Sequence, residues 1–292
     1  MAVVIPCYAQ ARFLADALGS LRSQTTPPAE IVVVDDGSPD DVAGAAAAFP
    51  EARVVAQENR GLSGARNRGI AESDAPFLIF LDADDRLLPH AIQTHLAWME
   101  DHPGAAFCWG FNRPFRDDGG PVNWGPTSFS GVPGYAPLLE ENVVGSPLGV
   151  LFRRDAVEAS GGFAEDAAAC EDWEIYLRLA RDHDIGCVGR VVAEYRHHGE
   201  NMSSKADLMY SAALDVLHRQ ERWVAGNPSL ERALAKGRRN ASVRYGVPAR
   251  IAAMREAISE GRWLGAGAAA LDMVLRSPSS TFRATWNRLR GG

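Results

Sequence analysis

Short apolar runs with strand character alternate with helical stretches over the first 110 residues, and this alternation constrains the fold more than any other feature. The expected elements are, in chain order, strand 2–5, helix 12–24, strand 31–34, helix 39–49, strand 53–56, helix 62–72, strand 76–81, helix 89–102 and strand 105–111. Such alternation is typical of an α/β fold with a mostly parallel, Rossmann-like sheet and helices on both faces. Ligands of these sheets bind beyond the carboxyl ends of the strands, so functional residues are expected there.

The rest of the chain is less regular at first and then helical. Residues 112–147 are rich in Gly, Pro, Asn and Ser and are expected to be largely irregular. A strand over 148–153, a helix over 172–182 and a strand over about 187–195 follow. From residue 205 the pattern is helical, with breaks expected near Pro228, Gly246-Val247-Pro248 and Pro278.

These elements predict two domains. The first covers residues 1–204 and consists of two halves, 1–110 and 111–204. The second is a helical C-terminal appendage over residues 205–292. A chain of this length is long enough for one large α/β domain plus such an appendage.

Charge is distributed unevenly between these two parts. Residues 1–204 contain 15 Lys and Arg against 30 Asp and Glu, a net of −15, whereas residues 205–292 contain 15 against 7, a net of +8. An acidic main body argues against nucleic acid as a partner. The basic region either contacts an anionic membrane surface or is a solvated helical face, and both interpretations stay open.

Nothing in the sequence predicts export or a membrane span. The chain has no run of 18 or more apolar residues, and it does not start with a basic segment followed by an apolar one. Its four cysteines lie far apart without a C-x-x-C pair, which favours reduced, mostly buried thiols over zinc ligands. We therefore expect a cytoplasmic protein, with peripheral contact at the inner face of the membrane as an option.

Three separated acidic clusters are the candidates for chemistry. The first, Asp35-Asp36-Gly37-Ser38, follows the strand expected over 31–34. Its carboxylates can accept hydrogen bonds from a base N–H or a ribose hydroxyl, and Gly37 allows the backbone to turn close to a ligand. The alternative is a turn in which Ser38 caps the next helix, and both functions can coexist.

The second cluster, Asp82-Ala83-Asp84-Asp85, follows the strong apolar strand that ends at Leu81. In an extended chain Asp82 and Asp84 would point the same way, about 6.5–7 Å apart. Their repulsion would be relieved by a divalent cation such as Mg²⁺ or Mn²⁺, which takes carboxylate and phosphate oxygens as ligands. The alternative is a solvated turn, but clustered charge beside a buried strand is costly.

The third cluster, Glu171-Asp172-Trp173, opens the helix expected over 172–182. Acidic residues are favoured at a helix N-terminus by its dipole, so capping is one interpretation. The other is a general base, a carboxylate that takes a proton from an attacking hydroxyl. Spacing alone does not decide between them.

Six motifs in series resemble the family 2 glycosyltransferases, which have a GT-A fold. They are V-V-I-P-C-Y, V-V-V-D-D-G-S, N-R-G-L-S-G-A-R-N-R-G-I, F-L-D-A-D-D, G-G-F followed by C-E-D-W-E-I-Y-L-R-L, and Y-R-H-H-G-E-N-M-S. Together they span about residues 2–204 in the order typical of the family. The resemblance implies that residues 1–110 form the nucleotide-binding half and residues 111–204 the acceptor-side half.

The resemblance implies roles for the residues near the nucleotide. Asp36, with Asp35 beside it, would contact the base or the ribose. Pro6 and Tyr8 would line the same pocket. The pair Arg66-Asn67 would either approach the donor or pin the loop in which it lies.

The resemblance also implies a metal site. Asp84 would be the principal ligand of a D-x-D element, and Asp82 would hold the ribose or the water shell of the metal. His198 matches a histidine that can complete the metal or diphosphate site, and His197 would replace it if the register slips by one. The implied cofactor is Mn²⁺ or Mg²⁺.

The implied reaction is transfer of a sugar from a nucleotide diphospho-sugar to a hydroxyl of a saccharide or lipid-linked saccharide, with inversion. Asp172 would be the catalytic base, and Glu171 and Trp173 would bind the acceptor. The chain lacks the long hydrophobic C-terminal segment of the membrane-embedded polysaccharide synthases in the same family. Two alternatives are a non-catalytic module that holds a nucleotide or a sugar, and a nucleotidyltransferase. The second would need a glycine-rich, basic phosphate loop near the N-terminus, where this chain has V-V-I-P-C-Y-A-Q-A-R.

Overall fold

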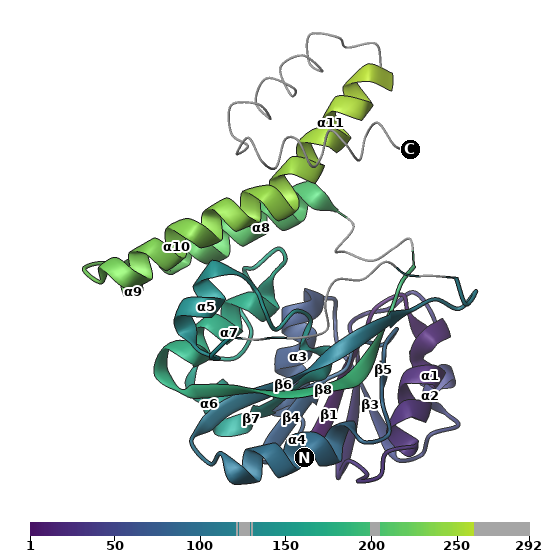
Figure 1. Cartoon of the computed structure of the whole chain (residues 1–292). Coiled ribbons are helices and arrows are strands. Elements are labelled where there is room, and N and C mark those ends of the chain that lie inside the picture. Colours follow the sequence, from purple (N-terminus) through teal and green to yellow (C-terminus); the bar gives the residue numbers. More distant parts are fainter. Residues whose placement is uncertain (121, 123–128, 130, 199–204, 260–292) are drawn as a thin grey trace. The chain divides into compact units, whose positions relative to one another are not determined.

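The structure is a computed structural model that describes residues 1–120, 122, 129, 131–198 and 205–259 (Figure 1). The chain divides into two compact units. The first contains residues 1–138 and 142–199, and the second contains residues 139–141 and 200–292. All three acidic clusters and both histidines of the Y-R-H-H motif belong to the first unit.

The first unit is built on one eight-stranded sheet with the order β3-β2-β1-β4-β7-β6-β8-β5. The strands are β1 (Ala2–Cys7), β2 (Glu30–Asp35), β3 (Ala52–Ala56), β4 (Phe77–Phe80), β5 (Arg86–Leu87), β6 (Ala105–Phe115), β7 (Val150–Arg153) and β8 (Asp184–Arg196). β7 lies antiparallel between β4 and β6, and β5 is antiparallel to β8. The other neighbours pair in parallel, so all strands except β5 and β7 run the same way. The mostly parallel sheet is therefore confirmed.

Helices cover both faces of this sheet, as the sequence predicts (Figure 1). They are α1 (Ala11–Arg22), α2 (Val42–Ala46), α3 (Gly61–Ala71), α4 (Ala91–Asp101), α5 (Tyr135–Glu140), α6 (Arg154–Ala159) and α7 (Glu171–Asp182).

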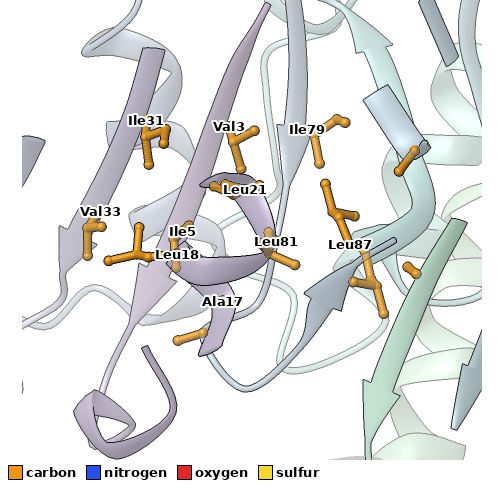
Figure 2. Packing of buried hydrophobic residues seen from close by; sticks show 14 of the residues in the cluster. Val3, Ile5, Ala17, Leu18, Leu21, Ile31, Val33, Ile79, Leu81 and Leu87 are labelled. Carbon is orange, nitrogen blue, oxygen red and sulfur yellow. The ribbon is translucent and has the colours of Figure 1, made fainter. Parts of the chain in front are cut away.

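The two faces of β1 illustrate how the core is divided. Val3 and Ile5 belong to the hydrophobic cluster that α1, α2 and α4 complete, with Leu18 packed beside them (Figure 2). Val4 faces the other way and meets α3, where a Cβ on Gly69 would come within 2.1 Å of a Val4 methyl group. Because consecutive strand residues point to opposite faces, an unbroken apolar run is what a strand buried on both faces needs.

The structure differs from the sequence prediction at several elements. The helix expected over 39–49 covers only Val42–Ala46, because the Asp41 side chain accepts a hydrogen bond from the Gly44 N–H (2.8 Å) and fixes the helix start there. The helix expected over 89–102 begins at Ala91, after the short strand β5. Residues 112–147 are not wholly irregular, since β6 continues to Phe115 and α5 lies within them. Residues 121, 123–128 and 130 of that stretch lie outside the described residues.

The described part of the C-terminal region, residues 205–259, is helical as predicted. It contains α8 (Ala206–Arg219), α9 (Glu221–Val224), α10 (Pro228–Ala241), a π-helical turn (Ser242–Gly246) and α11 (Val247–Ser259). Pro228 opens α10, but the break expected near Pro248 is wrong. Proline cannot donate a backbone hydrogen bond. The π-helical turn before Pro248 accommodates this missing donor, so the chain stays helical. The break expected at Pro278 lies outside the described residues.

Candidate functional site

The carboxyl ends of several strands bring the predicted site residues to one edge of the sheet. β1, β2 and β4 are neighbouring parallel strands, with Cys7 in register with Asp35. The first acidic cluster therefore follows β2 and the second follows β4 at the same edge. β8 runs in the same direction and ends at Arg196, two residues before His198. This placement agrees with the rule that ligands bind beyond the carboxyl ends of parallel strands.

In the first cluster the two carboxylates have different tasks. Asp35 Oδ1 accepts a hydrogen bond from the Ser38 N–H (2.8 Å) and closes the turn. Asp36 is buried, and its Oδ1 accepts hydrogen bonds from Gln57 Nε2 (2.7 Å) and the Arg60 N–H (2.8 Å). Gly37 has a φ of +71°, in the left-handed region that favours glycine. Asp35 is thus the turn residue, and Asp36 is a carboxylate held rigidly at the strand end.

Ser38 does not cap α2, contrary to the alternative drawn from the sequence. The cap is Asp41. The Ser38 hydroxyl instead donates to the Cys7 carbonyl and accepts from the Ala9 N–H, each at 3.2 Å. Ser38 therefore joins the first cluster to the end of β1.

The second cluster is a turn rather than an extension of β4, so the expected parallel orientation of Asp82 and Asp84 is wrong. The Asp85 N–H donates to the Asp82 carbonyl (3.0 Å), which closes the turn. Asp82 Oδ1 accepts a hydrogen bond from Arg66 Nη2 (3.0 Å). Asp84 Oδ2 lies instead 2.8 Å from His198 Nε2. The turn sends the two carboxylates to different partners.

Asp84 and His198 form the pair of groups best suited to a divalent cation. Asp84 Oδ2 also accepts a hydrogen bond from Gln10 Nε2 (3.2 Å), and the Phe13 ring lies 5.2 Å from the His198 ring. Both side chains are largely buried, with exposed fractions of 8% for Asp84 and 16% for His198. Carboxylate oxygen and imidazole nitrogen are ordinary ligands of Mn²⁺, so the donor set fits such an ion.

The residues that the structure describes do not supply a full coordination shell by themselves. Among the described residues, no three His, Cys, Asp or Glu side chains are grouped so that they could hold a metal ion. A cation held by Asp84 and His198 would take its remaining ligands from substrate phosphates or water, as Mg²⁺ usually does. His197 is placed differently, because its N–H donates to the Phe115 carbonyl (2.8 Å) and its ring lies against Tyr195.

Arg66 of α3 joins the second acidic cluster to the third. Its side chain is 1% exposed. Nη1 donates to Glu171 Oε1 (2.6 Å), and Nη2 donates to Asp82 Oδ1 (3.0 Å). Burial raises the pKa of Asp82, and the Arg66 charge counteracts this effect. The guanidinium thus allows two carboxylates to lie close together inside the protein.

Asp172 lies in the first turn of α7, directly after Glu171. Burial, followed by the neighbouring Glu171 charge, raises the pKa of Asp172 to about 7. Two contacts act in the opposite direction and lower this pKa: the hydrogen bond that Oδ1 accepts from the Trp173 N–H (2.6 Å), and the charge of Arg66. A carboxyl group that titrates near neutral pH is suited to accept a proton from a substrate hydroxyl.

The remaining predicted residues have mixed placements. Pro6 is buried within β1, and Tyr8 follows that strand with 51% of its side chain exposed. Asn67 pins a loop: its Nδ2 donates to the Phe163 carbonyl (2.9 Å) and its Oδ1 accepts from the Phe163 N–H (2.8 Å). Trp173 is 3% exposed and its Nε1 donates to the Leu138 carbonyl (2.8 Å), so an acceptor contact does not fit its placement.

Sequence reasoning missed Gln10, Gln57 and Arg196 as residues of this site. Gln10 contacts Asp84, Gln57 contacts Asp36, and Arg196 contacts the main chain of Asp84. Only Arg196 had a sequence signal, because it lies in the Y-R-H-H motif beside the predicted histidines. The two glutamines lie in segments where polar side chains are common, so their residue type does not mark them as site residues.

Comparisons with known proteins identify the family of this chain. The sequence profile described as "Glycosyl transferase family 2" matches residues 2–161. "Uncharacterized protein MT1568" of Mycobacterium tuberculosis (strain CDC 1551 / Oshkosh) is 29% identical over 278 residues, which cover 88% of this chain and 84% of that protein. Against some other relatives the chain spans as little as 30% of their length.

Two solved structures share the fold. The mannosyltransferase PcManGT from Pyrobaculum calidifontis, in complex with GDP-Man and Mn²⁺, has a TM-score of 0.65 at 18% identity and matches 98% of this chain and 82% of its own. TarS 1-349 of S. aureus, in complex with UDP-GlcNAc, has a TM-score of 0.59 at 15% identity and matches 95% of this chain and 92% of its own. The predicted GT-A type fold is thereby confirmed.

Proposed function

The chain belongs to glycosyl transferase family 2, and on this premise we propose that it transfers a sugar from a nucleotide diphospho-sugar to a hydroxyl acceptor, with inversion at the anomeric carbon. The acceptor is a saccharide or a lipid-linked saccharide, and the reaction belongs to polysaccharide or glycoconjugate biosynthesis. The complexes of PcManGT with GDP-Man and of TarS with UDP-GlcNAc support a donor of the nucleotide diphospho-sugar class.

The base and ribose of the donor bind at the end of β2. Asp36 accepts a hydrogen bond from the base or the ribose, and Gln57 holds its carboxylate in place (2.7 Å). Tyr8 lies on the same edge of the sheet with half of its side chain exposed, so its ring can pack on the nucleotide. These groups contact the nucleotide part of the donor and not the atoms that react, so their task is to position the donor.

Asp84 and His198 would hold the divalent cation, Mn²⁺ or Mg²⁺, and Asp82 lies on the same turn, paired with Arg66. The donor atoms of Asp84 and His198 lie 2.8 Å apart, which supports a shared ligand. When bound, the cation supplies stabilisation of the negative charge on the departing diphosphate. That stabilisation makes a second protein acid for the leaving group unnecessary.

Asp172 is the general base. Its carboxylate takes the proton of the acceptor hydroxyl while the hydroxyl oxygen attacks the anomeric carbon and the bond to the diphosphate breaks on the opposite side. Glu171 adjoins it and is fixed by Arg66 at 2.6 Å. The main support for this assignment is the Arg66 side chain, which ties Glu171 to Asp82 and so brings α7 to the second acidic cluster.

The test compares Asp172→Asn with wild type in transfer and in binding. A screen of nucleotide sugars for thermal stabilisation with Mn²⁺ first identifies the donor, since a ligand that binds the folded state raises its apparent stability. Asp172→Asn should then lower kcat by about 10²- to 10⁴-fold and leave donor affinity nearly unchanged, because it removes a proton acceptor and little volume.

Asp182→Asn is the matched control, since Asp182 ends the same helix and its side chain is 57% exposed beside Arg181. That variant should turn over like wild type. Full turnover by Asp172→Asn would defeat the assignment of the base. If the protein binds a nucleotide sugar but neither transfers nor hydrolyses it, a non-catalytic binding module explains the chain better.

A further inference from the structure

Arg196 at the end of β8 contacts three separate parts of the first unit. Its side chain is 2% exposed. Nε donates to the main-chain carbonyl of Asp84 (2.7 Å), and Nη2 donates to Asp16 Oδ2 of α1 (2.6 Å). Nη1 contacts the carboxylate of Asp117, which follows β6. One guanidinium therefore joins α1, the end of β6 and the turn that carries Asp84.

Two further contacts fix the orientation of this side chain. The guanidinium carbon lies 4.8 Å from the centroid of the Phe13 ring and 4.5 Å from that of the Phe115 ring. Both rings can make cation–π contacts with it. The backbone of Arg196 is held too, because its N–H donates to Asp85 Oδ1 (2.7 Å). Backbone and side chain of Arg196 thus hold adjacent residues of the Asp82–Asp85 turn.

The position of Arg196 in the chain connects these contacts to the cation site. His198 follows two residues later, and its Nε2 lies 2.8 Å from Asp84 Oδ2. Phe13, which packs on the guanidinium, also lies 5.2 Å from the His198 ring. The separation between the Asp84 carboxylate and the His198 imidazole therefore depends on how the turn is held against the end of β8.

We infer that Arg196 is a positioning residue of the cation site: it holds the main chain of Asp84 against the end of β8 and so places the Asp84 carboxylate beside the His198 imidazole. In this role Arg196 acts on the cation site through the main chain of Asp84. A guanidinium suits the task because its planar fork donates several hydrogen bonds in fixed directions, which an ammonium does not. The inference rests on the proposed function only in that the site holds a cation for the donor diphosphate.

Calorimetric titration of UDP and of GDP, each with Mn²⁺ or with EDTA, tests this with Arg196→Gln. Loss of a group that orients a metal ligand typically costs about 10- to 100-fold in metal affinity. Arg196→Gln should therefore lose about tenfold or more in diphosphate affinity with Mn²⁺ and stay within about twofold of wild type in EDTA. Equal losses in both conditions, or no loss in Mn²⁺, would overturn the inference.

Arg154→Gln is the matched control. Arg154 is also largely buried, and it donates to the carbonyls of Ile70 in α3 (2.9 Å) and of Ala75 (2.6 Å), which precedes β4, whereas Arg196 contacts the turn after β4. Its removal should cost stability as Arg196→Gln does, but it should leave the Mn²⁺-dependent gain in affinity intact. A loss of that gain in both variants would mean that general loosening of β4 is responsible.

A second readout needs no nucleotide. Ring ¹⁵N signals of His198, assigned with His198→Asn, report the hydrogen bond of Nε2 to Asp84. They should shift in Arg196→Gln and stay in place in Arg154→Gln, and unchanged signals in Arg196→Gln would contradict the inference. If wild type binds neither diphosphate, the proposed function fails, and this readout alone then decides the role of Arg196.

A third variant covers the case that Arg196→Gln does not fold. Asp16 and Asp117 are 53% and 64% exposed, so the double change Asp16→Asn with Asp117→Asn should leave the core intact. It removes two of the carboxylates that orient the guanidinium. We expect the Mn²⁺-dependent affinity to fall by about threefold, in keeping with the modest strength of exposed ion pairs. Wild-type affinity in this variant and in Arg196→Lys would contradict the inference.

Discussion

Asp172 has to be a carboxylate before it can accept a proton, so its pKa determines the pH dependence of the proposed reaction. Burial and Glu171 raise that pKa to about 7. The active, deprotonated form is therefore lost as the pH falls through about 7. We expect kcat/KM, which reports the free enzyme, to decline on the acid side of neutrality and to level off above it. A profile that is flat from pH 5 to 8 would contradict the assignment.

Glu171→Gln should shift this acid limb to lower pH. The change removes a negative charge that raises the pKa of Asp172 and leaves the lowering effect of Arg66 in place. Glu174→Gln is the control, because Glu174 lies in the same helix but pairs with Arg178 at 2.7 Å. Its profile should keep the midpoint of wild type. An unshifted limb in a folded Glu171→Gln variant would show that another group titrates.

Arg66→Gln should destabilise the protein in a pH-dependent way. It leaves the buried Glu171 and the partly buried Asp82 without their cation, and removing one partner of a buried ion pair typically costs about 3–5 kcal/mol. Without Arg66 the pKa of Asp82 rises further, because the Arg66 charge no longer lowers it, so protonation at lower pH removes the Asp82 charge. The loss in free energy of unfolding should therefore be largest near pH 8 and smaller near pH 5.5.

Denaturant unfolding at the two pH values measures this difference. Arg68→Gln is the control, since Arg68 lies on the same helix, is 41% exposed and pairs with Glu72. An exposed pair of that kind contributes about 0–1 kcal/mol. If Arg66→Gln lowers the free energy of unfolding equally at both pH values, lost packing causes the destabilisation, and buried charge does not.

At the scale of elements, α3 brings Arg66 to the site by packing closely on β1. A Cβ on Gly69 would come within 2.1 Å of Val4 Cγ1, so α3 can lie this close only because residue 69 has no side chain. Gly69→Ala should therefore lower the free energy of unfolding by about 1–3 kcal/mol, the usual cost of overpacking, even though alanine favours helix. Because the strain falls on the helix that carries Arg66, kcat should fall as well.

Gly19→Ala is the matched control for this change. Gly19 lies in α1, and a Cβ there would meet nothing within 4 Å. The same substitution should then stabilise the protein by about 0.5–1 kcal/mol through helix propensity. Thermal unfolding of both variants gives the comparison, and a stabilised Gly69→Ala would refute the close-packing explanation.

The elements that the sequence predicted well are those whose local pattern is strong. β1 and β4 are unbroken apolar runs, β2 has one between its first and last residues, and α1 has helical spacing and a proline boundary after it. β5 has two residues and α6 has six, which is too short for a periodic pattern to show. The carboxylates and their place at the strand ends could be predicted because parallel strands share an edge.

The contacts that complete the site could not be predicted in the same way. Arg66 and Glu171 are 105 residues apart, and Arg196 and Asp84 are 112 apart. Contacts between residues so far apart produce no periodic pattern in a single sequence. The turn over Asp82–Asp85 was only the alternative in the sequence analysis, because an acidic run after a strand is compatible with extension as well as with a turn.

At the scale of the whole molecule, the uneven charge remains to be explained. No helix in the part of the chain that the structure describes has the length and apolarity of a membrane span. Residues 205–292 nevertheless contain 15 Lys and Arg against 7 Asp and Glu. Several of these cations pair with acidic residues, as Lys236 does with Glu140 (2.5 Å). Others, such as Arg232 and Arg239, are exposed on α10.

We predict that this region attaches the protein to anionic membrane surfaces through charge alone. In a flotation assay the full chain should rise with vesicles that contain phosphatidylserine at low salt and should be released at about 0.5 M salt, because screening weakens interactions between exposed charges. Neutral phosphatidylcholine vesicles should not bind it. The double change Arg232→Glu with Arg239→Glu should reduce binding.

The control for that variant is Arg22→Glu with Arg190→Glu, which alters the net charge equally outside the basic region. If both double variants bind less, total charge is responsible, and if neither does, the exposed cations of α10 have no part in binding. Absence of flotation at low salt would instead favour the solvated helical face. A lipid-linked acceptor would then have to reach the site without help from this region, so the assay also bears on which acceptor class the enzyme can use.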